Sequence, residues 1–354
     1  MSWTHILGHP ERVESFRGIV ARGRLAHAYL FVGPVGVGKK LFARELAKTL
    51  LCESTSPGRD ALNACDQCDA CLLVDAGTHP DLFMIGRPED KNEFPIEVMK
   101  QFLHDFSLKT ARGRGKIAIV DDADDFNDES ANAFLKTLEE PPPGSVFFLI
   151  GTSLDRQLLT IRSRCQLVRF APLADAHVRT LLQKQEINDG AMLDRLVRLA
   201  GGSPGQALAL ADESLWKFRR ELLTGFTQPK IDSVGLAKSF VEFAEEAGKE
   251  AASQRRRASQ MLRLIIESFT DALRVQAGAA ARSADSAELP LLASLAQRAA
   301  PEKIHALLER CLETETHLGR YVQVSLVVEG LMDALGQLLE QAGPLPVRYQ
   351  GFSV

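Results

Sequence analysis

The sequence reads Gly33-Pro34-Val35-Gly36-Val37-Gly38-Lys39-Lys40 directly after the apolar run Tyr29-Leu30-Phe31-Val32 and before a helical pattern over residues 41–51. Glycines in such a loop let backbone N–H groups face a phosphate at the start of a helix, and Lys39 adds a cation for the terminal phosphates. A strand, a glycine-rich loop, a lysine and a helix in this order predict a P-loop. All eight residues of the loop are therefore candidate nucleotide-binding residues. The alternative is a glycine-rich turn that binds no ligand.

The last position of this loop departs from the usual P-loop pattern. A Ser or Thr hydroxyl there normally ligates Mg²⁺, whereas this chain has Lys40. An ammonium group cannot ligate a metal cation, and its charge repels one. We therefore expect a loop that can still hold the phosphates of ATP or ADP but disfavours Mg²⁺ and ordinary metal-assisted hydrolysis.

Length and composition indicate a soluble globular protein of two or three domains. The chain has 354 residues, of which 45% are hydrophobic and 25% charged. A net charge of −4 gives no overall attraction to nucleic acid, so DNA contact would need a local basic patch or a basic partner. No apolar run approaches the ~18 residues of a membrane span, and the N-terminus has no signal-peptide pattern. We therefore expect a cytoplasmic protein with no membrane partner.

Strand-like apolar runs alternate with helical patterns in the first half of the chain. The runs lie at 81–85, 117–120 and 146–150, with helical patterns at 98–106 and 132–139. Continuous apolar runs of this kind are typical of strands that a parallel sheet buries on both faces. The alternation predicts a doubly wound α/β domain over 1–170, with its ligand at the carboxyl ends of the strands. After it the patterns are helical over 171–226 and, beyond a linker near Pro229, over 227–354.

Two acidic residues and a threonine follow two of these runs. Asp121 and Asp122 come directly after 117–120, where a Walker B acid reaches toward the P-loop. The second acid is usually Glu in hydrolysing proteins, and a misplacement of about 1 Å can cost on the order of 100-fold in rate. The alternative is a solvated acidic loop made of Asp121, Asp122, Asp124 and Asp125. Thr152 follows 146–150 and either senses the γ-phosphate or caps the next turn.

Four cysteines are clustered near the P-loop helix. Cys52 is followed by Cys65, Cys68 and Cys71 in a C-x-x-C-x-x-C spacing. In a reducing compartment this spacing favours metal over disulfides. Four thiolates suit tetrahedral Zn²⁺ with no open position, so we expect a structural zinc site. Cys165 and Cys311 lie far from the cluster, and His79 is expected to be a turn residue rather than a ligand.

These motifs together resemble the bacterial DNA polymerase III clamp-loader subunits of the AAA+ class. The resemblance covers roughly residues 5–210. Besides the P-loop and the four cysteines, it rests on His27-Ala28-Tyr29-Leu30-Phe31, Gly77-Thr78-His79-Pro80-Asp81, the segment from Ala131 to Pro142 and Ser163-Arg164-Cys165. In isolation Ser163-Arg164-Cys165 is a weak motif, since an arginine there is also compatible with a surface salt bridge.

Within that family, three departures select a non-hydrolysing, stator-type subunit. They are Lys40 in the P-loop, Asp122 in place of the Walker B glutamate, and Gly205 where the ATP-hydrolysing gamma/tau subunits carry a sensor arginine. The resemblance implies that Arg164 acts in trans as an arginine finger on ATP bound to an adjacent gamma/tau-type subunit. Such a finger is worth ~10³–10⁵ in rate.

The resemblance also implies an architecture and partners. It implies an AAA+ P-loop domain over 1–170 with the zinc module inserted at 52–71, a small helical lid over 171–226 and an all-α collar over 227–354. The collar would join gamma/tau-type and delta-type subunits in a hetero-pentameric ring that acts on the sliding clamp and primed DNA.

Two other functions are compatible with the sequence. The chain would be an ATP-hydrolysing gamma/tau-type motor if Lys40 swings aside and Asp122 suffices. It would be a zinc-dependent DNA-binding module with a vestigial nucleotide fold if the cysteines serve DNA, although a pI of about 6.1 argues against this.

Overall fold

The computed structural model describes residues 3–4, 6–54, 62–91, 93–319 and 322–340. Part of the expected zinc module, residues 55–61, lies outside the described residues. The chain forms two compact units, one of Met1–Glu186 with Ala200–Ala207 and one of Ile187–Leu199 with Leu208–Val354. The two sequence-based domain boundaries, after residues 170 and 226, remain predictions.

The first unit is built on a parallel sheet. Its described strands are β1 (Ala28–Val32), β2 (Leu82–Ile85), β3 (Ile117–Val120), β4 (Val146–Gly151) and β5 (Gln166–Arg169), in the order β2-β3-β4-β1-β5. Each neighbouring pair is parallel. This confirms the doubly wound α/β fold expected of an AAA+ domain, and it places the ends of β1, β3 and β4 at one edge.

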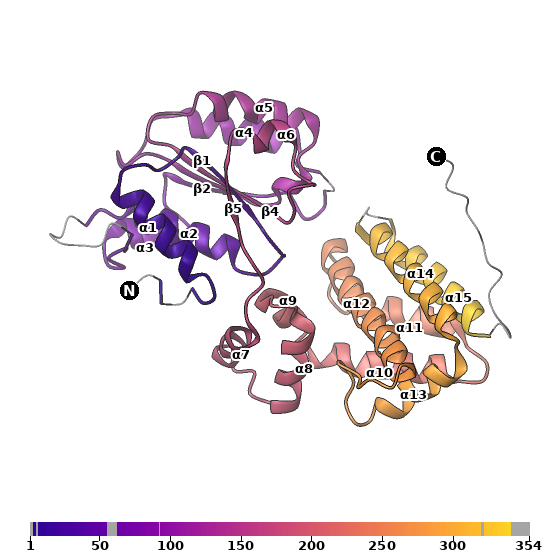
Figure 1. The fold of residues 1–354 in the computed structure, drawn as a ribbon. Coiled ribbons are helices and arrows are strands. Elements are labelled where there is room, and N and C mark those ends of the chain that lie inside the picture. The colour runs from indigo at the N-terminus through magenta and orange to yellow at the C-terminus, as the bar shows by residue number, and fades with distance from the viewer. Residues whose placement is uncertain (1–2, 5, 55–61, 92, 320–321, 341–354) are drawn as a thin grey trace, which may run out of the picture. The chain divides into compact units, whose positions relative to one another are not determined.

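Helices cover both faces of this sheet (Figure 1). On one face lie α1 (Pro10–Ala21), α2 (Lys39–Leu51) and α3 (Asp69–Ala76), and on the other lie α4 (Ile96–Ser107), α5 (Asp128–Glu139) and α6 (Leu159–Arg162). The central strands β1, β3 and β4 are buried at every position because both of their faces are covered. The edge strands β2 and β5 are mostly half-buried or exposed.

Aromatic side chains fill the core on both faces. Phe16 of α1 and Phe42 of α2 pack on Phe31 of β1, with ring centroids 6.0 and 5.9 Å from it. On the opposite face Phe106 of α4 and Phe134 of α5 lie 4.8 and 5.4 Å from Phe147 of β4. These contacts fix helix α2, and with it the P-loop, against the centre of the sheet.

The remaining described elements are helical, as the sequence predicts. They are the short 3-10 helix η1 (Ala123–Asp125) after β3 and the α-helices α7 (Asp175–Lys184), α8 (Gly190–Ala200), α9 (Pro204–Ala209), α10 (Glu213–Thr227), α11 (Ser233–Glu245), α12 (Ala251–Gln276), α13 (Leu289–Arg298), α14 (Pro301–Gly319) and α15 (Val324–Glu340). In the second unit α12 packs against α13 and α14, and α11 packs against α15. None of the described helices combines the length and the apolar character needed to cross a membrane.

Candidate functional site

The predicted P-loop connects β1 to α2, and the helix begins at Lys39, two residues before the helical pattern in the sequence. Gly36 and Gly38 have φ angles of +78° and +100°, which only glycine adopts without strain. Gly38 is the residue that precedes the first turn of α2. The loop therefore has the backbone that a phosphate cradle at a helix N-terminus requires.

Five consecutive carbonyl groups of this loop accept hydrogen bonds, two of them from Lys39 of the loop itself and three from other parts of the first unit. The pairs are Gly33 O and Pro34 O with Lys39 Nζ (2.5 and 2.7 Å), Val35 O with Ser203 Oγ (2.6 Å), Gly36 O with Gly205 N (3.0 Å), and Val37 O with His9 Nε2 (2.9 Å). Neither the His9 contact nor the Ser203 contact could be predicted from the sequence pattern. The loop is thus held both by its own lysine and by His9, Ser203 and Gly205.

Lys39 is buried, with 6% of its surface exposed. Burial lowers the pKa of its ammonium group, and the nearby carboxylates of Asp121 and Asp124 oppose that shift. Because Nζ contacts two carbonyls of its own loop, Lys39 must turn toward the pocket before it can meet a phosphate.

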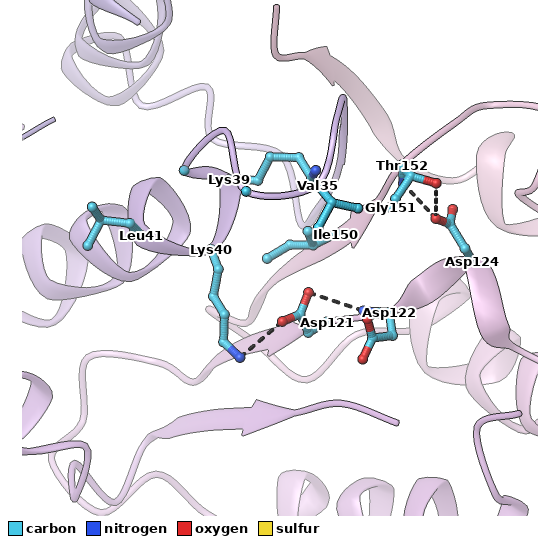
Figure 2. A pocket seen from close by; sticks show the side chains of 12 residues that line it. Val35, Lys39, Lys40, Leu41, Asp121, Asp122, Asp124, Ile150, Gly151 and Thr152 are labelled. Carbon is cyan, nitrogen blue, oxygen red and sulfur yellow. Dashed lines mark hydrogen bonds and ion pairs between the residues drawn. The ribbon is translucent and has the colours of Figure 1, made fainter. Parts of the chain in front are cut away.

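Lys40 forms an ion pair with the first Walker B acid. Its Nζ lies 3.0 Å from Oδ2 of Asp121, which directly follows β3 (Figure 2). The side chain of Lys40 is 55% exposed and that of Asp121 is 26% exposed. Asp122 has a left-handed backbone with φ of +55°. Burial, with the neighbouring Asp121 carboxylate, raises the pKa of Asp122.

Thr152 is held by Asp124, for which the sequence predicts at most a place in a solvated acidic loop. The backbone N and Oγ1 of Thr152 both donate to Oδ2 of Asp124, at 2.6 and 2.5 Å (Figure 2). Gln157 donates to the other oxygen of Asp124. Asp125 is bound by Arg87 at 2.8 Å. These acids of the loop are therefore engaged in hydrogen bonds and ion pairs.

A cavity of about 300 Å³ lies between the P-loop and the ends of β3 and β4. Most of the candidate nucleotide-binding residues line it, namely Val35, Gly36, Gly38, Lys39, Lys40, Asp121, Asp122 and Thr152. The candidates Gly33, Pro34 and Val37 do not line it. The structure thus brings the loop, both acids and the threonine together at the edge where ligands bind in such sheets.

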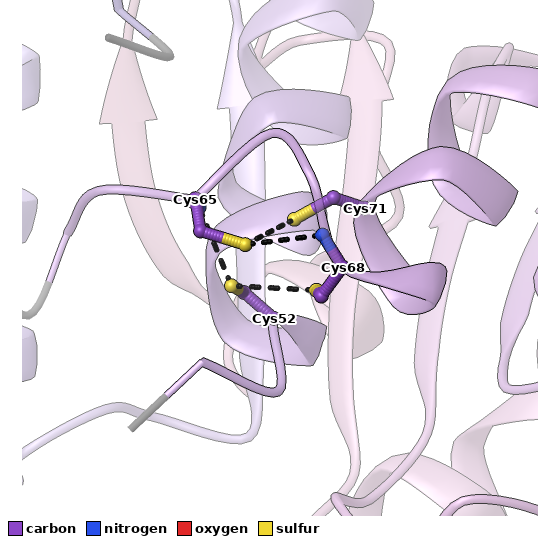
Figure 3. Close-up of side chains that lie close together, drawn as sticks. All are labelled: Cys52, Cys65, Cys68 and Cys71. Atoms are coloured by element: carbon purple, nitrogen blue, oxygen red, sulfur yellow. Dashed lines mark hydrogen bonds between the residues drawn. The ribbon is translucent and has the colours of Figure 1, made fainter. Parts of the chain in front are cut away.

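The four clustered cysteines converge at the other end of α2 (Figure 3). Their sulfur atoms all lie within 4.8 Å of one another, with Cys52 to Cys68 at 3.8 Å and Cys65 to Cys71 at 3.9 Å. Tetrahedral Zn²⁺ with Zn–S bonds of about 2.3 Å requires sulfur atoms about 3.8 Å apart. The donor set therefore fits structural zinc.

Charged residues that the sequence did not single out support this cysteine cluster. Lys48 of α2 is buried, and its Nζ lies 2.9 Å from Asp66 and 3.2 Å from Asp75. Glu53, next to Cys52, is bound by Arg112. His79 accepts a hydrogen bond from the backbone N of Asp81 at 3.1 Å, consistent with a turn residue.

Arg164 lies away from the P-loop cavity and is not among its lining residues. Its Nε donates to Oε1 of Glu139, the last residue of α5, at 3.0 Å, and its Nη1 donates to Thr160 O at 2.9 Å. The side chain is one-third exposed. Arg164 is therefore a held, partly exposed cation outside the chain's own nucleotide pocket.

Two protein-family models match the chain. The model described as "DNA polymerase III, delta subunit" matches residues 8–174. The model described as "DNA polymerase III, delta subunit, C terminal" matches residues 213–333. The two matches fall on both halves of the chain and cover most of it.

Individual relatives extend this result. DNA polymerase III subunit delta' of Escherichia coli (strain K12) is 29% identical over 330 residues, which are 92% of this chain and 93% of the relative. Subunit delta' of Pseudomonas aeruginosa is 35% identical over 206 residues, 58% of this chain and 61% of the relative. Subunit tau of E. coli is 33% identical over 219 residues, but these are 60% of this chain and 33% of the relative. Likeness over almost the whole length is thus seen with a delta' subunit rather than with tau.

Proposed function

The chain belongs to the DNA polymerase III delta-subunit family, and we propose that it acts there as a delta'-type stator. Such a subunit takes part in clamp loading during DNA replication and assembles with ATP-hydrolysing neighbours, but does not turn over ATP itself. The observation that carries the proposal is the Lys40–Asp121 ion pair at 3.0 Å. It puts an ammonium group on the acid that would serve a magnesium ion in a hydrolysing subunit.

Arg164 is the residue through which the chain acts on a neighbour. Glu139 and the Thr160 carbonyl hold its guanidinium at the end of α5, partly exposed and away from the P-loop cavity. In an assembly it would meet ATP bound to an adjacent gamma/tau-type subunit and stabilise the transition-state charge, an effect of ~10³–10⁵ in rate.

Two ligands complete the proposed function. The P-loop pocket binds the phosphates of a nucleotide, ATP or ADP. Cys52, Cys65, Cys68 and Cys71 hold a zinc ion that cross-links the end of α2 to the start of α3, so its role is structural. Zinc bound by four thiolates has no open position for a substrate.

The assembly is a ring of five subunits with gamma/tau-type and delta-type partners, which engages the sliding clamp and primed DNA in the cytoplasm. The domain limits proposed for it are the AAA+ domain over 1–170, the lid over 171–226 and the collar over 227–354. In the second unit Phe226, Phe240 and Phe269 are fully buried between helices. A well-packed helical core of this kind supports the proposal that this part of the chain is a rigid surface for subunit contacts.

Reconstitution with a gamma/tau-type and a delta-type subunit tests the proposal. We expect hydrolysis at the one adjacent gamma/tau-type site to fall by ~10³-fold or more when the chain carries Arg164→Ala, so the ring should keep only the ATPase rate of its other sites, with assembly unchanged by size-exclusion chromatography. Arg164→Lys should rescue little, because an ammonium lacks the planar fork of the guanidinium. Arg169→Ala, at an exposed arginine on β5, is the matched control. An unchanged rate in an intact ring with Arg164→Ala would contradict the proposed role.

A further inference from the structure

The P-loop pocket does not fit the magnesium ion that P-loop proteins normally bind with their nucleotide. Two acids, Asp121 and Asp122, are in place at the end of β3. The hydroxyl ligand, however, is replaced by Lys40, whose Nζ lies 3.0 Å from Asp121 Oδ2. A divalent ion placed at Asp121 would compete with this ammonium for the same oxygen and be repelled by it.

The phosphate-binding part of the pocket is nevertheless intact. The carbonyls from Gly33 to Val37 are all occupied by donors of the fold. Among the described residues, the backbone N–H groups of Gly38, Lys39 and Lys40 have no hydrogen-bond acceptor, since Gly38 is the N-cap of α2 and the two lysines begin its first turn. All three residues line the cavity. The anion-binding groups are thus retained while the metal ligand is lost.

The cations available to a bound phosphate all come from the loop itself. Of the described residues that line the cavity, Lys39 and Lys40 are the ones with a positive charge. Gly205, at the sensor-arginine position, lies against the loop, and a Cβ there would meet the Gly36 Cα at 2.7 Å. The lid side therefore has no room to supply a third cation at this point.

We propose that the pocket binds the phosphates of a nucleotide without magnesium, and that the Lys40 ammonium, tethered beside Asp121, takes the place of the ion. This rests on the proposed nucleotide binding by the P-loop and specifies its chemistry. The ligand class is a metal-free nucleoside di- or triphosphate. Lys40 neutralises Asp121, which would otherwise repel the phosphates, and Lys39 turns from its loop carbonyls to meet them.

The test is a calorimetric titration of the full-length chain with ADP, in buffer freed of divalent ions by resin and in buffer with excess Mg²⁺. Resin treatment of the buffer replaces EDTA, which would also remove zinc from the cysteine cluster. We expect ADP to bind the wild-type chain equally well without Mg²⁺, or more tightly, with any gain from Mg²⁺ below about threefold. Binding that is at least ~10-fold tighter with Mg²⁺, or no ADP binding in either buffer, would overturn the proposal.

Substitution of Lys40 sharpens the result. Lys40→Thr restores the hydroxyl and frees Asp121, so ADP binding should become at least ~10-fold tighter in Mg²⁺ than without it. Lys100→Thr, at an exposed lysine on α4, is the matched control and should behave as the wild type. A Lys40→Thr variant that shows no dependence on Mg²⁺ would count against the role of Lys40. This assay measures ADP binding by the isolated chain, whereas the Arg164 test measures ATP hydrolysis in the reconstituted ring. Each result can therefore contradict its own proposal without contradicting the other.

Discussion

The two ends of helix α2 differ in how well their side chains suit a metal ion. At its C-terminal end, Cys52 meets three further thiols, all within 4.8 Å, in a set that fits zinc (Figure 3). At its N-terminal end, Lys40 places an ammonium 3.0 Å from the acid that a magnesium ion would use (Figure 2). The same helix therefore connects a donor set that suits a metal ion to one that disfavours it.

The comparison shows that the backbone of a P-loop can be kept when the side chain that ligates magnesium is absent. The left-handed glycines Gly36 and Gly38 and the buried strand β1 are those of a P-loop, although its metal ligand is missing. A subunit that serves as a stator needs the shape of the ATPase domain, because its neighbours pack on that shape. It does not need the ion, whereas the thiols at the opposite end of the helix form a donor set that fits zinc.

The largest effect on stability is expected from a substitution in the cysteine cluster, at the C-terminal end of α2. Cys71 is fully buried among the four thiols, so Cys71→Ser should abolish zinc binding and lower the free energy of unfolding. The loss should stay below the ~10–16 kcal/mol that zinc contributes in small modules, because the core around the sheet remains. Elemental analysis and chemical denaturation measure both. Cys165→Ser, outside the cluster, is the control. A Cys71→Ser variant with a full zinc content and unchanged stability would contradict a structural zinc site at these cysteines.

A smaller effect is expected where the α9 segment meets the P-loop. A Cβ on Gly205 would lie 2.7 Å from the Gly36 Cα, which is backbone and cannot move aside easily. Gly205→Ala should therefore destabilise the chain by ~1–3 kcal/mol through overpacking, as measured by denaturant unfolding. Gly190→Ala, where nothing lies within 4 Å, is the matched control. A Gly205→Ala variant as stable as the wild type would contradict the close contact between Gly205 and the Gly36 backbone.

The smallest effect is expected from the pH dependence at His9, which donates to Val37 O at 2.9 Å. Burial lowers the pKa of His9 below its ordinary value of 6.5. The unfolded chain then binds the proton more readily, so stability present at neutral pH is lost as the pH falls below that value. His79, whose pKa burial also lowers, adds to the same trend. Glutamine at position 9 keeps a donor without the titration, so His9→Gln should flatten part of the decline between neutral and mildly acidic pH. An identical pH profile would exclude His9 as a contributor.

The parts of the structure that the sequence predicts are those determined by local pattern. The apolar runs 117–120 and 146–150 become the buried strands β3 and β4, because short continuous apolar runs are typical of strands covered on both faces. The C-x-x-C-x-x-C spacing brings three thiols together at the start of a helix, and Cys52 completes the set from the end of α2. The doubly wound fold follows from the alternation of these elements.

The parts that the sequence could not predict depend on contacts between distant segments. Ser203 reaches Val35 O across 168 positions of the chain, and no periodicity in either segment indicates it. Asp124 looked like one of several loop acids, yet its position after β3 ties it to Thr152. The pairing of Lys40 with Asp121 required the sheet order, which sets the end of β3 beside the start of α2.

Phosphate release by the isolated chain in excess Mg²⁺ and ATP tests the central claim most directly. The account predicts a steady-state rate no higher than that of Lys39→Ala, measured alongside as the background. A clear rate in the wild-type chain that Lys39→Ala abolishes would contradict it, because the P-loop end of α2 would then be a working magnesium-dependent ATPase site.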